Sequence, residues 1–161
     1  MKPATGKLGV LCVGLGAVTT TFITGTLMYR KGLGIPGSSI TQMAKIRVGR
    51  GEKKAYKKIG EIVPLADVND MVFGAWDIFT DSAYESAINA EVLKTKDIDP
   101  VRDELKAIVP MKAAFDPDYV SRLHGENVKS GTRWELVEAL REDIRRFVKE
   151  NGCERAVVIW A

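Results

Sequence analysis

The sequence predicts an α/β protein with a Rossmann-like parallel sheet and helices on both of its faces. Short apolar runs of strand length alternate with segments of helical periodicity, which is typical of parallel strands joined by helical crossovers. The first apolar run ends in a glycine-rich turn, and a long segment without charged side chains follows. A strand, a glycine turn and a helix in this order open many domains that hold a dinucleotide pyrophosphate.

The composition is that of one soluble globular domain, so residues 1–161 are expected to form a single unit. The formal charge of +3 is too small to indicate a nucleic-acid partner. Two cysteines cannot build a disulfide framework, which suits a reducing, cytoplasmic location. The single histidine, His124, argues against a transition-metal centre and is expected on a loop or at the surface.

The uncharged stretch at residues 8–29 raises the alternative of a signal peptide or a membrane span. It contains five threonines and four glycines, and the mean hydropathy of the chain is −0.07. Such a composition suits a lipid-facing helix poorly. We therefore expect no membrane segment, because a helix buried against a sheet has the same uncharged character.

In the first half of the chain, residues 8–13 (LGVLCV) are expected to form a strand buried on both faces. The following helix is expected to end at Lys31, before Gly32. Residues 32–39 are expected to form a loop. Residues 45–58, rich in lysine and arginine, are expected to be a solvated, mobile excursion. An arm that contacts phosphate or a partner is the alternative.

Further along, residues 71–75 (MVFGA) form a second predicted strand. Asp81 or Ser82 can cap a helix that runs to about Lys94, and Pro100 is expected in the first turn of another helix.

A short strand is predicted at residues 112–115. Thr132 and Glu135 form a capping box for the most regular helix, which Gly152 ends. Residues 156–160 (AVVIW) are expected to form another buried strand. The chain stops at Ala161, directly after this strand. Ligands of open α/β sheets bind where such strands end, so we expect the chain to be a fragment of a longer protein.

The glycine turn is the main candidate site. Gly14 permits a tight turn out of the strand, and Gly16 lets the backbone approach a pyrophosphate. The amides that follow, at Ala17 and Val18, lie at the positive end of the helix and can donate to phosphate. A plain turn between strand and helix, without a ligand, is the alternative.

Two features depart from the usual dinucleotide pattern. The third glycine position holds Thr19, which must relax the packing of helix on strand, and the hydroxyl of Thr19 or Thr20 could donate to phosphate instead. The acid expected about twenty residues after the turn is absent. Asp77, at the end of the second predicted strand, can replace it as acceptor for a ribose hydroxyl if the strands are parallel. A helix cap or turn former is the alternative for Asp77.

The ordered set of motifs resembles the myo-inositol phosphate synthase family. After the glycine turn, residues 37–42 (GSSITQ) are similar to its Gly-Ser-Met-Thr-Gln segment, and residues 75–78 (AWDI) to its Gly-Trp-Asp-Ile. Further matches lie at residues 83–87 (AYESA), 131–134 (GTRW), 140–151 and 157–161 (VVIWA). The family often has Gly-Gly-Asn-Asn-Gly at the turn and a glycine at the place of Ala75. Threonine is common there at the place of Ala161.

The resemblance implies that the cofactor is NAD. Contacts carried over from the family, together with the Thr19 considered above, fall on Gly14, Gly16, Ala17, Val18, Thr19, Asp77, Ile78 and Ala161. No catalytic residue and no metal ligand is expected in this chain, since the family's catalytic lysines lie beyond its last residue.

The resemblance also implies an isomerase that converts glucose 6-phosphate to myo-inositol phosphate by oxidation, intramolecular aldol closure and re-reduction. Such an enzyme serves inositol and phospholipid biosynthesis, and family members are homo-oligomers, here expected to be tetramers. Two alternatives stay open. One is an NAD-dependent dehydrogenase or reductase that shares only the fold. The other is a non-enzymatic module that uses residues 45–58 as a partner-binding arm.

Overall fold

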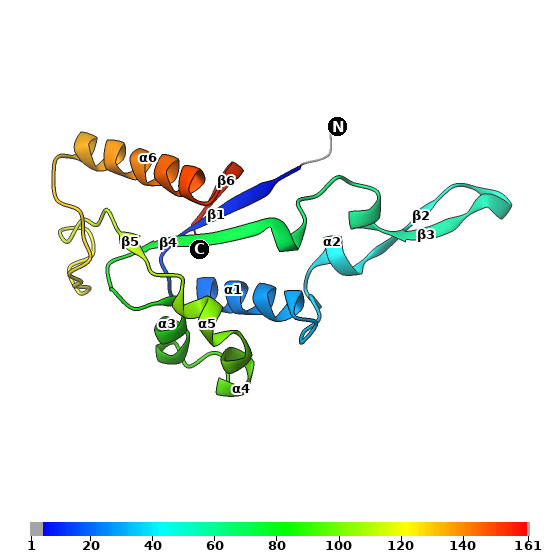
Figure 1. The fold of residues 1–161 in the computed structure, drawn as a ribbon, viewed down its shortest axis with the longest axis horizontal. Helices are drawn as coiled ribbons and strands as arrows, with labels where there is room; N and C mark the ends of the chain where they lie inside the picture. The colour runs from blue at the N-terminus through cyan, green and yellow to red at the C-terminus, as the bar shows by residue number, and fades with distance from the viewer. Residues whose placement is uncertain (1–4, 161) are drawn as a thin grey trace.

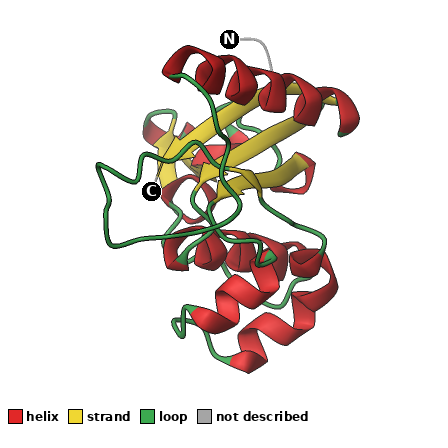
Figure 2. Cartoon of the chain, turned by 90° about the vertical axis from the view of Figure 1, so that its left-hand side faces the viewer, coloured by secondary structure: helices red, strands yellow, loops and turns green. Residues whose placement is uncertain are grey.

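The computed structural model describes residues 5–160, and its centre is a four-stranded sheet in the order β5-β4-β1-β6. All neighbouring strands in it are parallel. The strands are β1 (Lys7–Val13), β4 (Met71–Asp77), β5 (Met111–Lys112) and β6 (Cys153–Trp160). Helix α6 (Arg133–Glu150) covers one face, and α1 (Ala17–Arg30) lies on the other (Figures 1 and 2). Three short helices lie on the same side as α1: α3 (Ala83–Asn89), α4 (Thr95–Ile98) and α5 (Arg102–Lys106). The predicted Rossmann-like sheet with helices on both faces is confirmed.

The remaining elements are short. They are α2 (Ile40–Met43), β2 (Lys45–Val48), β3 (Ala55–Lys58), α3 (Ala83–Asn89), α4 (Thr95–Ile98) and α5 (Arg102–Lys106), with 3-10 turns at Gly51–Lys53, Ile59–Glu61, Val68–Asp70 and Asp99–Val101. Within residues 5–160, no helix combines the length and apolar character needed to cross a bilayer.

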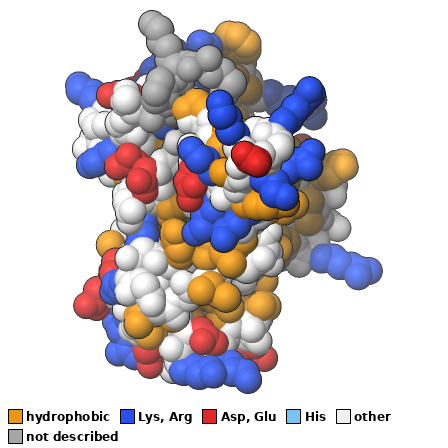
Figure 3. Space-filling model, turned by 90° about the vertical axis from the view of Figure 1, so that its right-hand side faces the viewer, with side chains coloured by type: hydrophobic (Ala, Val, Ile, Leu, Met, Phe, Trp, Pro, Cys, Tyr) orange, Lys and Arg blue, Asp and Glu red, His pale blue; other side chains and the backbone are white. Residues whose placement is uncertain are grey.

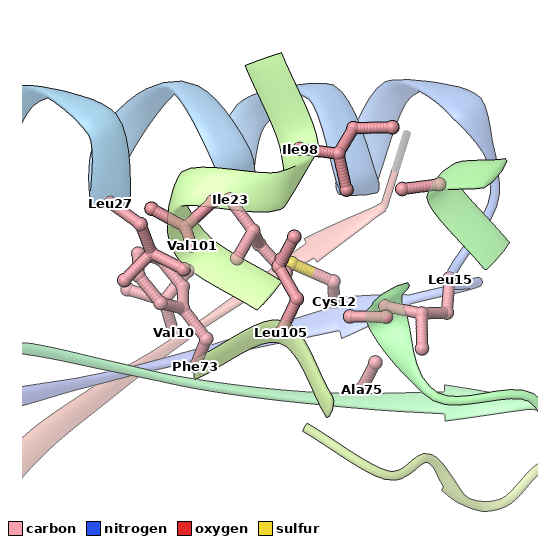
Figure 4. Packing of buried hydrophobic residues seen from close by; sticks show 12 residues of the cluster. Val10, Cys12, Leu15, Ile23, Leu27, Phe73, Ala75, Ile98, Val101 and Leu105 are labelled. Atoms are coloured by element: carbon pink, nitrogen blue, oxygen red, sulfur yellow. The ribbon is translucent and has the colours of Figure 1, made fainter. Parts of the chain in front are cut away.

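The main core lies between the sheet and α1. Alternate residues of β1, Val10 and Cys12, point toward the helix and pack with Ile23 and Leu27 (Figure 4). Ile98, Val101 and Leu105 close this cluster from α4, the adjoining 3-10 turn and α5, and each is fully buried. Burial of this apolar surface fixes α1 against β1, so the start of the helix is held at the end of the strand.

On the opposite face, α6 packs through Phe147. A Cβ added to Gly9 would lie 3.1 Å from the Phe147 ring, and one added to Gly74 only 2.6 Å from it. Glycine on two neighbouring strands therefore makes room for one aromatic ring. This contact joins α6 to the middle of the sheet.

The strand ends define one rim of the sheet. In register, Val13 of β1 lies beside Trp76 of β4 and Trp160 of β6. The carboxyl ends of three parallel strands thus meet at the same edge, where ligands bind in open α/β sheets.

Several local predictions are confirmed. The first helix ends at Arg30, with Lys31 as C-cap and Gly32 in the left-handed region. Ser82 and Thr132 each accept a hydrogen bond in a complete capping box. Residues 32–39 form a loop. His124 is exposed on a loop.

Other local predictions are wrong. The helix predicted to reach Lys94 ends at Asn89, because Glu91 adopts a left-handed backbone that stops it. The strand predicted at residues 112–115 covers only Met111–Lys112, followed by one bridge between Ala113 and Val128.

The last strand is not buried as predicted. Val157, Val158 and Trp160 are 41%, 48% and 86% exposed. Within the described residues, β6 is hydrogen-bonded to β1 on one side and forms the edge of the sheet, so its apolar composition does not bring burial.

Residues 45–58, predicted to be a solvated and mobile excursion, have regular secondary structure that the prediction did not include. They form an antiparallel hairpin of β2 and β3, in which Lys45 pairs with Lys58 and Val48 with Ala55. Every residue of both strands is exposed, and the hairpin extends away from the sheet (Figure 1). Figure 3 shows Lys and Arg side chains gathered at this end of the molecule. The solvated excursion is therefore a defined basic hairpin.

Candidate cofactor site

The turn after β1 begins at a position that only glycine can occupy without backbone strain. Gly14 has φ +88°, and its amide donates to the carbonyl of Trp76 at 2.8 Å. The chain thus leaves β1 while still hydrogen-bonded to β4. A left-handed backbone at this position explains why the turn requires glycine.

The start of α1 presents free donors to open space. Gly16 is the N-cap residue, and within the described part of the chain no side chain caps this end and no acid stands in its first turn. The first amides of a helix have no partner inside the helix, which here concerns Ala17, Val18 and Thr19. A Cβ added to Gly14 or Gly16 would meet nothing within 4 Å. This end of the helix therefore fits a phosphate group.

The hydroxyls of Thr19 and Thr20 are not free to donate to a phosphate at the start of α1. Thr19 Oγ1 donates to the carbonyl of Gly14 at 2.8 Å, and Thr20 Oγ1 donates to that of Gly16 at 3.0 Å. Both side chains are buried. The structure thus does not support the predicted hydrogen bond from a threonine hydroxyl to phosphate. The hydroxyls instead stabilise the turn by bonding to its main chain.

Next to the turn, the side chains of Cys12 and Thr19 are both buried. Burial raises the pKa of the Cys12 thiol, and a hydrogen bond with Thr19 offsets only part of this rise. The thiol is therefore neutral at physiological pH, as expected for a small buried residue.

Asp77 lies beside the turn at the end of β4. Its Oδ2 accepts from the amide of Leu15 at 2.5 Å, and its Oδ1 accepts from the amide of Phe79 at 3.0 Å. Each carboxylate oxygen has a second lone pair, so the half-buried Asp77 can still accept from a ligand hydroxyl. The expectation that Asp77 shares a rim with the glycine turn is confirmed.

A cavity of about 640 Å³ joins these groups. Its walls include the glycine turn, Asp77, Ile78 and Phe79, with Ser86 and Asn89 from α3 and Leu123 from a distant loop. This volume lies within the range of about 300–1,000 Å³ found for small-molecule and cofactor sites. No local signal in the sequence points to Leu123, because the other residues that line the cavity lie more than thirty positions away along the chain.

An ion cluster around the buried Asp143 supports the other side of β4. Asp143 of α6 accepts from Trp76 Nε1 at 2.9 Å and forms ion pairs with Lys129 and Arg146, both at 2.7 Å. Burial alone would raise the pKa of Asp143, but the hydrogen bonds from Lys129 and Trp76 outweigh it and hold the pKa below its usual range. The cluster fixes Trp76, the residue that precedes Asp77.

Within residues 5–160, no group of three His, Cys, Asp or Glu side chains is placed to hold a metal ion. The site combines the uncapped start of α1, the carboxylate of Asp77 and an apolar wall.

Comparison with known proteins decides the family. A family model of the NAD-binding part of myo-inositol-1-phosphate synthase matches residues 8–161. The chain belongs to the myo-inositol-1-phosphate synthase family. NAD is the cofactor of the matched family domain, and the open turn beside Asp77 fits it.

Relatives agree across the whole chain. It is 58% identical to inositol-3-phosphate synthase 1 of Bacteroides thetaiotaomicron, over 100% of this chain and 37% of that protein. It is 32% identical to inositol-3-phosphate synthase 1 of rice, over 96% of this chain and 33% of that protein. The crystal structure of inositol-3-phosphate synthase from Caenorhabditis elegans superposes with a TM-score of 0.86 at 27% identity, over 99% of this chain and 34% of that one. The chain thus spans about a third of the length of these synthases.

The residues expected to contact the cofactor fall together in this family domain. Seven of them line the one cavity: Gly14, Gly16, Ala17, Val18, Thr19, Asp77 and Ile78. The eighth, Ala161, lies outside the described residues.

Proposed function

We propose that this chain is the first part of the NAD-binding domain of an inositol-3-phosphate synthase, with residues 1–161 forming one unit. The observation that carries the proposal is the placement of an uncapped helix start and the Asp77 carboxylate at one 640 Å³ cavity, in a chain of this family. The activity belongs to the complete enzyme, an isomerase that converts glucose 6-phosphate to myo-inositol phosphate.

Each residue of the cavity has a proposed role. Gly14 and Gly16 leave room for the pyrophosphate, and the amides of Ala17, Val18 and Thr19 donate to its oxygens. For Thr19, the proposal rests on the amide, because its hydroxyl is already bonded to Gly14.

The adenosine half is proposed to lie toward β4. Asp77 accepts a hydrogen bond from a ribose hydroxyl, and Ile78 contributes an apolar wall beside it. Ala161 is proposed as a further contact, by family resemblance. When bound, NAD accepts a hydride from the sugar and returns it, so that no net oxidation occurs.

This chain is proposed to carry no catalytic residue, and it is expected to be inactive by itself. The complete enzyme is proposed to be a cytoplasmic homo-oligomer, a tetramer by family resemblance, that serves inositol and phospholipid biosynthesis. Glucose 6-phosphate is its proposed substrate, with no nucleic-acid or membrane partner.

The test uses the complete enzyme with glucose 6-phosphate and a small, catalytic amount of NAD. A phosphorylated cyclitol should form in many-fold excess over the cofactor, while the absorbance of NADH stays flat. A dehydrogenase that shares only the fold would instead stop after one equivalent of NAD and accumulate NADH. That result would overturn the proposal, as would titration calorimetry that detects no NAD binding.

A further inference from the structure

The loop after β4 is held from outside by a segment far along the chain. Residues 123–129 cross this loop, and Asn127 is the buried residue at the contact. Its amide nitrogen Nδ2 donates to the carbonyl of Asp77 at 2.9 Å and lies 3.3 Å from that of Phe79. Its main-chain amide donates to the carbonyl of Ile78 at 2.9 Å. Nδ2 also lies 3.3 Å from the carbonyl of Met111 and 3.4 Å from that of Pro110, and its two hydrogens are shared among these acceptors. Asn127 thus bonds the main chain of Asp77 and Ile78 and ties the loop to the start of β5.

The crossing segment approaches this loop closely at a second point. A Cβ added to Gly125 would collide with the main-chain carbonyl of Ile78. Backbone therefore packs on backbone here, and only glycine allows this approach. The loop cannot move outward without displacing the segment.

The crossing segment is itself anchored to the rest of the fold. The amide of Ala113 donates to the carbonyl of Asn127 at 3.0 Å, and the amide of Lys129 donates to the carbonyl of Ala113 at 2.8 Å. Lys129 also forms the ion pair with Asp143 of α6. The segment is thus fixed to Ala113, which follows β5, and to α6.

We infer that Asn127 is a positioning residue for the adenosine ribose, acting through the main chain of residues 77–79. The Asp77 carboxylate has to be placed within about 0.5 Å to grip a hydroxyl productively. The bond from Leu15 fixes one of its oxygens, while Asn127 fixes the main chain that carries it. This inference rests on the proposed function, because it assigns a cause to the ribose contact of the same site.

The test measures how strongly the complete enzyme distinguishes NAD from an analogue without the 2′-hydroxyl, or the 3′-hydroxyl, of its adenosine ribose. The wild type should bind NAD more tightly than at least one analogue by about tenfold, the value of one good hydrogen bond to a charged group. Asn127→Ala and the isosteric Asn127→Asp should lose most of this discrimination, because they should lower the affinity for NAD and leave the affinity for the analogue unchanged. Gly125→Ala, which pushes on Ile78, should do the same by an independent route.

The matched control is Ile98→Val, a change at a buried position of α4 that is not among the residues lining the cavity. It should lower the melting temperature but keep the ribose discrimination, which separates positioning from a general loss of stability. All measurements are made well below each variant's melting temperature, on protein whose circular dichroism shows the native fold.

The outcomes separate the two hypotheses. A wild type that does not bind NAD contradicts the proposed function. A wild type that binds NAD without distinguishing either analogue overturns the inference alone. So do folded Asn127 and Gly125 variants that retain the wild-type discrimination.

Discussion

The amide of Leu15 donates to the carboxylate of Asp77 across 2.5 Å, although the two residues are 62 positions apart in the chain. This bond connects the glycine turn after β1 to the end of β4. The group proposed to hold the ribose therefore also stabilises the turn proposed to hold the pyrophosphate, and a change at Asp77 should affect both.

Replacing Asp77 with Asn should weaken NAD binding. The amide group of the new side chain must face either Leu15 or Phe79, both of which are donors, and the charge that strengthens the ribose contact is lost. Hydrogen bonds to charged groups contribute about 1.5–3 kcal/mol, so the Kd for NAD should rise by roughly ten- to a hundredfold. Titration calorimetry measures this. Asp81→Asn, in the wall of the same cavity, is the control and should change the Kd far less.

Replacing Gly16 with Asp should separate stability from binding. Aspartate is a favoured N-cap residue and complements the positive helix end. The free energy of unfolding, measured with urea, should therefore stay the same or rise by up to about 0.5 kcal/mol. Its charge lies where a pyrophosphate must bind, so NAD affinity should fall by more than about tenfold.

Gly16→Asn provides the matched control, with nearly the same shape and capping ability but no charge. It should weaken NAD less than Gly16→Asp does. Equal losses would show that bulk, and not charge, is what the site rejects.

Replacing Asp143 with Asn should destabilise the protein in a pH-dependent way. Because its pKa is lowered in the folded state, Asp143 contributes stability above its unfolded value of about 3.9, and loses it as the pH falls through the folded value. Asp143→Asn leaves Lys129 without its ion-pair partner, so stability at pH 7 should fall by about 3 kcal/mol.

The decisive measurement for Asp143 is urea unfolding across pH. The gap between wild type and Asp143→Asn should be largest at neutral pH and should shrink below about pH 4, as the wild-type carboxylate becomes protonated. A gap that is constant with pH would contradict the ion cluster.

Two glycine-to-alanine changes should act in opposite directions. Gly74→Ala places a Cβ 2.6 Å from the Phe147 ring and should destabilise the protein by about 1–3 kcal/mol. Gly25→Ala, on an exposed part of α1 with nothing within 4 Å, should stabilise it by up to about 1 kcal/mol. Thermal unfolding of the pair checks this, and a stable Gly74→Ala variant would refute the close packing of α6 on β4.

Neutralising the basic hairpin should leave the cofactor site intact. The triple change of Lys53, Lys54 and Lys57 to Gln removes charge from exposed residues that do not line the cavity, so the Kd for NAD should not change. Heparin binding that persists near 0.15 M salt in the wild type and disappears in the variant would favour a partner-binding arm.

The parts of the fold that obey local rules could be predicted from the sequence. The tight turn at Gly14 follows from the conformational freedom of glycine, and the caps at Ser82 and Thr132 follow from short side chains that accept from amides three residues ahead. The parallel strands followed from apolar runs separated by helices.

The parts that depend on distant contacts could not be predicted in this way. Nothing near Asn127 in the sequence shows that it meets Asp77, 50 residues earlier, and the partners of Asp143 come from two other elements. The hairpin had a usable signal in the alternation of Ile46 and Val48 with charged residues, but its high charge favoured the prediction of a mobile segment.

The insertion between α1 and β4 has a consequence for how such sites are found. About forty residues, including the basic hairpin, separate Arg30 from Met71, yet Val13 and Trp76 remain direct neighbours in the sheet. The acid that is absent at the customary distance along the chain thus has a proposed counterpart, Asp77, which lies beside the turn at the end of the neighbouring strand. A search that measures spacing across strands, rather than along the sequence, would detect this site and would tolerate relatives whose insertions differ in length.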